Sequence, residues 1–253
     1  MYAAPMARQS KPRAKTAERS RASKKRKPRI RPLRWLFRWL FRAVVLGLAL
    51  AVFAALFYTV VNPITGIYMK REEYRLGSID QEWVDLDQIA PVMARSVVAA
   101  EDANFCNHWG FDMTAIRNAI DAGGKRGAST LTQQVVKNVY LWQGRNWTRK
   151  ALEALMTPIV ELIWTKRRIV EVYLNVAEFD EGVFGVDAAA HHYFGIGPDQ
   201  LSARQAALLA AVLPSPKQRS ASRPNEFVNR RARAIEDGAA TIKADGRASC
   251  FED

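Results

Sequence analysis

The chain has 253 residues, of which 49% are hydrophobic, so it is long enough and apolar enough to build one sizeable folded core. Its net charge of +13 lies at one end: residues 1–42 carry 15 Lys and Arg against one acid, which gives +14, and the remainder carries 23 bases against 24 acids, which gives −1. A nucleic-acid-binding domain keeps its basic patch on the folded part. This distribution excludes nucleic acid as the expected partner.

The first elements in chain order are a basic tail and an apolar helix. Residues 1–33 lack the apolar residues that would offset ordering entropy, so we expect a disordered tail. Residues 43–61 are nineteen residues without a charge, enough for a helix to span a bilayer core. A buried core helix is the alternative, but the run has no polar face. We therefore expect residues 34–62 to form a juxtamembrane segment and a single transmembrane helix.

The flanking charges predict the orientation of this helix. Lys and Arg are in excess before it, whereas residues 70–75 after it are of mixed charge. We therefore expect a single-pass protein of the cytoplasmic (inner) membrane, with the N-terminus in the cytoplasm and residues 63–253 outside. The apolar run continues past Ala49-Leu50-Ala51, which favours an uncleaved anchor over a cleaved signal peptide. The tail would set this topology and contact anionic membrane lipid.

The outer body, residues 63–253, is expected to be mainly α-helical. Apolar residues recur at helical spacing in four stretches, and strand signals are few. The four stretches are 92–102, 130–142, 151–179 and 201–213. Residues 64–69 could form a short extended piece, and from residue 215 we expect a surface loop, a charged final helix and a loose end.

The two cysteines, Cys106 and Cys250, are too few for a disulfide scaffold. A bridge between them cannot be deduced from the sequence alone. We therefore expect two free thiols.

Residues 127–138, GASTLTQQVVKN, combine a helix start with a polar stripe. A glycine at the entry, with Ser129 or Thr130 near the helix start, leaves unpaired N–H groups that suit an anion. The polar side chains that share one face are Ser129, Thr130, Gln133, Gln134, Lys137 and Asn138. Such a stripe is usually a solvated face, but solvated faces usually hold Glu and Lys. These residue types favour a hydroxyl-rich or phosphate-bearing ligand.

Residues 144–153 place cations at the next helix start. Arg149 and Lys150 are spaced to pair with Glu153, so ordinary surface ion pairs would explain them. Together with Arg145, however, these cations oppose the helix dipole. An anionic ligand would resolve that conflict.

Residues 100–112 hold two adjacent acids, then an aromatic residue, a histidine, a glycine and a further acid. Glu101 and Asp102 end a helix, where the dipole disfavours carboxylates and would raise a pKa into the range of a general base. A solvated helix end and a metal site with His108 and Asp112 are the alternatives. The spacing matches no zinc signature, so we expect no metal ligands here and a structural His108.

In combination, these residues are similar to the monofunctional biosynthetic peptidoglycan transglycosylases of glycosyltransferase family 51, a module also found in class A penicillin-binding proteins. Five blocks carry the resemblance, in the order of the family and within about 95 residues. They are Glu101-Asp102 with Phe105, His108, Gly110 and Asp112; the stretch 127–138; RKALE ending at Glu153; KRRIVEVYLN at 166–175; and GVDAAAHHYFG at 185–195.

The resemblance implies a mainly α, lysozyme-like domain that polymerises lipid II into β-1,4-linked glycan strands for cell wall biogenesis and cell shape. It implies inversion at the muramyl C1 and release of polyprenyl diphosphate. Glu101 would be the catalytic base, and the second catalytic residue, Glu153, would orient cations, hold a divalent ion or assist the base. The implied substrate-binding residues are Ser129, Gln133, Lys137, Arg145 and Lys150. The implied supporting residues are Asp102, Phe105, His108, Asp112, Gln134 and Asn138, and Glu171 is taken as structural.

No cofactor is implied as required, although a divalent cation, Mg²⁺ or Mn²⁺, could bind at the diphosphate. The expected partners are lipid II, the growing glycan strand and membrane lipid, with a transpeptidase or proteins of division or elongation as candidates. The chain contains neither SxxK nor KTG, so we expect no transpeptidase activity. Two rivals stay open: a lysozyme-like hydrolase, which would not need the cations at 137 and 145, and a membrane-anchored scaffold with a degenerate site.

Overall fold

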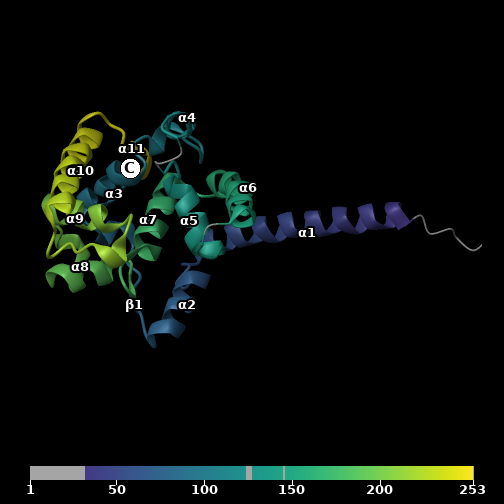
Figure 1. Cartoon of the computed structure of the whole chain (residues 1–253), viewed down its shortest axis with the longest axis horizontal. Coiled ribbons are helices and arrows are strands. Elements are labelled where there is room, and N and C mark those ends of the chain that lie inside the picture. The colour runs from purple at the N-terminus through teal and green to yellow at the C-terminus, as the bar shows by residue number, and fades with distance from the viewer. Residues whose placement is uncertain (1–31, 124–126, 145, 253) are drawn as a thin grey trace, which may run out of the picture. The chain divides into compact units, whose positions relative to one another are not determined.

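The computed structural model describes residues 32–123, 127–144 and 146–252 (Figure 1). It divides into two units, residues 1–44 and 45–253, and the boundary lies inside the first helix, α1 (Pro32–Val60). Among the described residues, α1 is the one helix long and apolar enough to cross a membrane, and almost none of it is buried. The predicted apolar helix is thus confirmed. Most of the predicted tail lies outside the described residues, but Pro32 and Leu33, which we assigned to it, already begin α1.

The second unit is mainly α-helical, as predicted, with short 3₁₀ turns and three short strands between the helices. After α1, the helices and strands are α2 (Ile67–Leu76), β1 (Asp80–Gln81), α3 (Pro91–Glu101), α4 (Met113–Asp121), α5 (Leu131–Tyr140), α6 (Trp147–Ile163), α7 (Lys166–Val176), β2 (Glu178–Asp180), β3 (Val183–Phe184), α8 (Val186–Phe194), α9 (Ala203–Val212), α10 (Glu226–Ala244) and α11 (Ser249–Glu252). The 3₁₀ turns are η1 (Leu86–Gln88), η2 (Phe105–Asn107), η3 (Pro198–Gln200) and η4 (Pro216–Gln218).

Two groups of helices form the core. Helices α3, α9 and α10 pack together and lie side by side in Figure 1. Small residues of α9, such as Ala206 and Ala210, are fully buried and let these helices approach closely. Helix α5 packs against α6 and α7, with Leu131 and Val135 fully buried. The site described below lies where α3 ends and α5 begins.

The strands form one small sheet in the order β1-β3-β2. Strand β1 pairs with β3 in parallel, with Asp80 opposite Val183, whereas β2 pairs with β3 in the antiparallel direction. The prediction of a short extended piece at residues 64–69 is wrong, because Ile67 already begins α2. The β-branched residues at its start resembled a strand, but the buried Met69 and Glu72 have the helical spacing of three residues.

The C-terminal end differs from the prediction in two ways. Cys106 and Cys250 form a disulfide, so the expected free thiols are wrong. The expected loose end is also wrong, because residues 249–252 form α11 and Phe251 is fully buried. These contacts join residues 144 positions apart, and no local sequence pattern reports such a meeting.

Candidate active site

Glu101 is the last residue of α3 and points its carboxylate toward α5 and α10. Its Oε2 accepts a hydrogen bond from Gln134 Nε2 at 3.0 Å, and its Oε1 lies 3.4 Å from Arg231 Nη2. The side chain is 14% exposed. Burial raises the pKa of Glu101, while Gln134, Arg231 and Lys137 act against that rise. The predicted direction is therefore found, but burial rather than the helix dipole is its main cause.

Asp102 ties the end of α3 to the start of α5. Its Oδ2 accepts from the backbone N–H of Leu131 at 3.0 Å, and its Oδ1 lies 2.8 Å from His108 Nε2. His108 is thus engaged with a buried carboxylate and stands edge-on to the ring of Phe105. The predicted structural role of His108 is consistent with these contacts.

The start of α5 is capped from both directions. Thr130 Oγ1 accepts from the backbone N–H of Gln133, and the Gln133 side chain accepts from the backbone N–H of Thr130 at 3.1 Å. Thr130 also donates its hydroxyl to the Gly110 carbonyl at 2.7 Å. Gly110 has φ +80°, and a Cβ there would come within 2.7 Å of Thr157, so glycine is required. Gln133 is buried in this cap, so it does not lie on an open ligand-binding face.

Lys137 lies one turn further along α5, among the charges of both candidate catalytic acids. Burial lowers the pKa of Lys137, while Glu153 and Glu101 oppose that shift. A cavity of about 220 Å³ adjoins it, lined also by Gln134, Asn138 and Tyr173. Lys137 lines this cavity, and Gln134, which also lines it, connects the wall to the Glu101 carboxylate. Groups with displaced pKa values are often found at functional sites.

Glu153 forms the second centre, on α6. Its carboxylate accepts from Arg149 Nη1 at 2.6 Å and from Lys150 Nζ, and Lys150 also lies 3.1 Å from Ser129 Oγ. The predicted pairings are present, but Glu153 is 3% exposed, so these are not ordinary surface ion pairs. Asn146 caps the helix start through the N–H of Arg149 at 2.7 Å. Arg145, which we also expected here, lies outside the described residues.

The remaining predicted residues have structural contacts of their own. Asp112 caps α4 by accepting from the N–H of Ala115 at 2.8 Å, and Phe105 is fully buried. Asn138 accepts from Gln143 at 3.2 Å beside Lys137. Glu171, taken as structural, pairs with Arg168.

The sequence alone did not single out two residues that touch this site. Tyr173 donates its hydroxyl to Gln134 Oε1 at 3.4 Å, which continues the contact from Gln134 to Glu101. Its signal was present, because it lies inside the block 166–175. Arg231 of α10 carried no such signal. Within the described residues, no group of three or more His, Cys, Asp and Glu side chains is placed to hold a metal ion.

Comparison with known proteins identifies the family. The sequence model of the transglycosylase family matches residues 70–239. The biosynthetic peptidoglycan transglycosylase of Jannaschia sp. (strain CCS1) is 65% identical over 194 residues, which cover 77% of this chain and 81% of that protein. The protein of the same name from Stutzerimonas stutzeri (strain A1501) is 50% identical over 179 residues, 67% of this chain and 74% of the relative. The chain therefore belongs to the transglycosylase family, the family 51 glycosyltransferases that its five sequence blocks resemble.

Proposed function

We propose that the chain is a peptidoglycan glycosyltransferase of cell wall biosynthesis that polymerises lipid II into β-1,4-linked glycan strands. The observation that carries this proposal is the partly buried Glu101 carboxylate, which is hydrogen-bonded to Gln134 and shares one electrostatic environment with the partly buried Lys137 and, through Lys137, with Glu153. Family membership indicates the class of reaction. These residues would supply the two groups that it needs: a base to deprotonate the acceptor hydroxyl and cations to stabilise the leaving diphosphate.

Glu101 would act as the general base. The 4-hydroxyl oxygen of the acceptor sugar forms a bond to the muramyl C1 of the donor, and its proton passes to the Glu101 carboxylate. The C1–oxygen bond to the diphosphate breaks on the opposite face, and polyprenyl diphosphate leaves with the electron pair, so the configuration at C1 inverts. A raised pKa suits this role, because a base must hold the proton that it takes from a weakly acidic alcohol.

Cations would stabilise the departing diphosphate, which is already a good leaving group and needs no strong general acid. Lys137, held among the charges of both acids, and Lys150, next to Ser129, are the described cations suited to this task. Glu153 would fix Arg149 and Lys150 in place, since it binds both. A divalent cation at the diphosphate would add positive charge there. Its ligands would be oxygens of the substrate rather than side chains of the protein.

We also propose that the catalytic unit works outside the cytoplasm, anchored by α1. The disulfide supports this orientation, because disulfides persist in oxidising compartments and are rare in the cytosol. Helix α1 also contacts the body near the membrane end of the chain's outer part, because Trp164 Nε1 donates to the Ala55 carbonyl at 2.8 Å. Lipid II and membrane lipid would therefore reach the site from the same surface. Because the chain has neither SxxK nor KTG, we infer no transpeptidase activity and a separate protein for cross-linking.

Incubation of the full chain in detergent with lipid II tests the proposal. We expect glycan polymer and released polyprenyl diphosphate. Glu101→Gln should reduce polymer formation by at least about a hundredfold, as loss of a positioned base does, while circular dichroism stays unchanged. Glu226→Gln, which removes one exposed carboxylate from α10, is the matched control and should retain full activity. Shortened glycan without polymer would support a hydrolase, and full activity of Glu101→Gln would refute the assigned base.

A further inference from the structure

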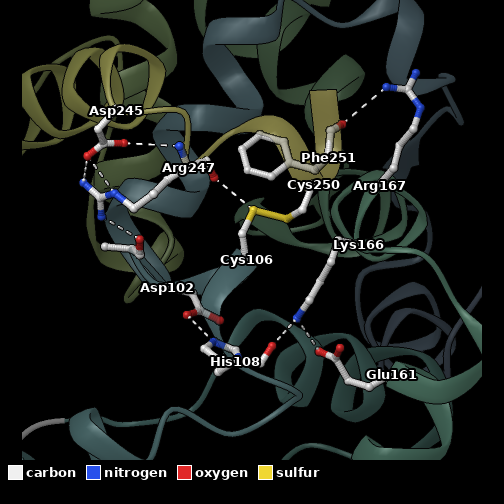
Figure 2. Close-up of a disulfide and its surroundings, with 11 residues drawn as sticks. Asp102, Cys106, His108, Glu161, Lys166, Arg167, Asp245, Arg247, Cys250 and Phe251 are labelled. Carbon is white, nitrogen blue, oxygen red and sulfur yellow. Dashed lines mark hydrogen bonds and ion pairs between the residues drawn. A yellow bond between two sulfur atoms is a disulfide. The ribbon is translucent and has the colours of Figure 1, made fainter. Parts of the chain in front are cut away.

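The disulfide lies close in sequence to the carboxylate that we assign as the base. Cys106 belongs to the 3₁₀ turn η2, between Asp102 and His108, and Cys250 belongs to α11. Figure 2 shows the bond joining the loop that carries Asp102 and His108 to the C-terminal end of the chain. The chemistry of glycosyl transfer makes no direct use of either sulfur, so the position of the bond calls for a separate explanation.

The loop after Glu101 has several attachments of its own: His108 contacts Asp102 at 2.8 Å, the His108 carbonyl accepts from Lys166 Nζ at 2.9 Å, and Asn104 donates to Asp112 at 3.2 Å. Its buried surface is nevertheless small. Between residues 103 and 109, only Phe105 is fully buried. Most of the others are exposed, and no side chain caps the start of η2. A loop with so little buried surface would sample alternative positions unless something else holds it.

The C-terminal segment adds contacts to the first part of this loop, residues 103–106. Arg247 Nη1 donates to the Ala103 carbonyl at 2.9 Å, and the ring centroid of Phe251 lies 6.5 Å from that of Phe105. Arg167 Nη1 donates to the Phe251 carbonyl at 3.3 Å. Because α11 has only four residues, it cannot be stable by itself and depends on these contacts and on the disulfide.

The same C-terminal segment also reaches the base itself. Arg231 of α10 lies 3.4 Å from Glu101 Oε1. The chain from α10 to α11 thus contacts both Glu101 and the loop that follows it. The disulfide attaches α11 to Cys106, so the segment from α10 to α11 is linked to the end of α3 at two points, Glu101 and Cys106.

We propose that the Cys106–Cys250 disulfide is a positioning cross-link for glycosyl transfer: it holds the loop after Glu101 against α11 and so keeps the base and Asp102 aligned with α5. The proposal rests on the function proposed above. In the folded protein the bond ties η2, which begins three residues after Asp102, directly to α11. Its restriction of the unfolded chain is a separate contribution to stability. Full activity is therefore reached only by the oxidised protein, and neither cysteine contacts the substrate.

The bond is open to experiment because both cysteines are only partly buried. A dithiol reductant transfers two electrons and two protons: the S–S bond breaks, two cysteine thiols form, and the reductant closes its own disulfide. Oxidised glutathione reverses the step by accepting two electrons and two protons from the cysteine thiols, which yields the protein disulfide and two glutathione thiols. One sample can therefore be measured oxidised, reduced and reoxidised.

The test compares these three states of the full chain in detergent, with two thiols per chain counted after reduction. We expect reduction to lower kcat for lipid II polymerisation roughly threefold to tenfold, since small misplacements of a catalytic group have effects of this order or larger. KM should change less than about twofold, because the cross-link does not touch substrate. Reoxidation should restore kcat. The variant C106A/C250A is the matched control: it should have the low kcat throughout and no response to reductant.

Hydrogen exchange supplies a readout independent of activity. Backbone amides of residues 103–109 should exchange faster after reduction, and those of α9 should not. Unchanged kcat with two titrated thiols, or unchanged exchange in this loop, would overturn the proposal. If C106A/C250A fails to fold, reduction of the native protein still decides the question. Absence of polymer from the oxidised protein would instead overturn the proposed function, and the exchange rates would still support or overturn the cross-link.

Discussion

The buried Asp102 carboxylate links the end of α3 to the start of α5, and its removal should lower the stability of the fold. Asp102→Ala deletes the acceptor for the Leu131 N–H at 3.0 Å and for His108 Nε2 at 2.8 Å. Leu131 is fully buried, so no water replaces the lost acceptor. Hydrogen bonds to charged groups contribute about 1.5–3 kcal/mol each, so loss of two should lower the free energy of unfolding by about 3–6 kcal/mol. At roughly 2–4 °C per kcal/mol, Tm should fall by about 10 °C.

Asp102→Asn is the matched variant, because its amide oxygen can still accept from Leu131 while the charge is lost. We expect it to lose less than half as much Tm as Asp102→Ala. The assay is thermal unfolding of the full chain in detergent, followed by circular dichroism, with lipid II polymerisation measured on the same samples. Polymerisation should fall in the same order as Tm, since Asp102 holds α5 against the end of α3. A Tm loss below about 2 °C for Asp102→Ala would refute the reasoning, because it is smaller than one lost hydrogen bond predicts.

Two further predictions concern the pH dependence of polymerisation. The Gln134 hydrogen bond lowers the pKa of Glu101 against the effect of burial, so Gln134→Leu should raise that pKa further. Since the base acts deprotonated, the acid limb of the pH–rate profile should move to higher pH, and an unmoved limb would contradict the contact. Burial lowers the pKa of Lys137, so its charge is lost as the pH rises through that lowered value. Lys137→Arg keeps its charge beyond about pH 12, so the alkaline limb should move to higher pH even where the maximal rate is lower; an identical alkaline limb would exclude Lys137 as its source.

Local relations in the sequence predicted much of the site. The helix ending at Glu101, the helix start at Thr130 and the spacing of Glu153 from Arg149 and Lys150 are all confirmed, because each depends on residues within one or two turns. The exposure of these groups was not predictable in the same way. An acid spaced four residues from a basic residue shows the same sequence pattern whether its helix face is solvated or buried. Only the packing of α5 against α6 makes Glu153 buried.

The electrostatic character of Glu101 shows why the rest required the fold. Its pKa is raised mainly by burial, and the charge nearest to it besides Asp102 comes from Arg231, 130 residues away. Neither quantity is encoded near residue 101, because both arise when α10 closes over the end of α3. The same closure brings Cys250 to Cys106. A motif can therefore indicate which carboxylate to propose as the base, whereas the pKa of that carboxylate depends on distant segments. Substitution of Arg231, which lies outside the five sequence blocks, should accordingly alter the pH profile of catalysis.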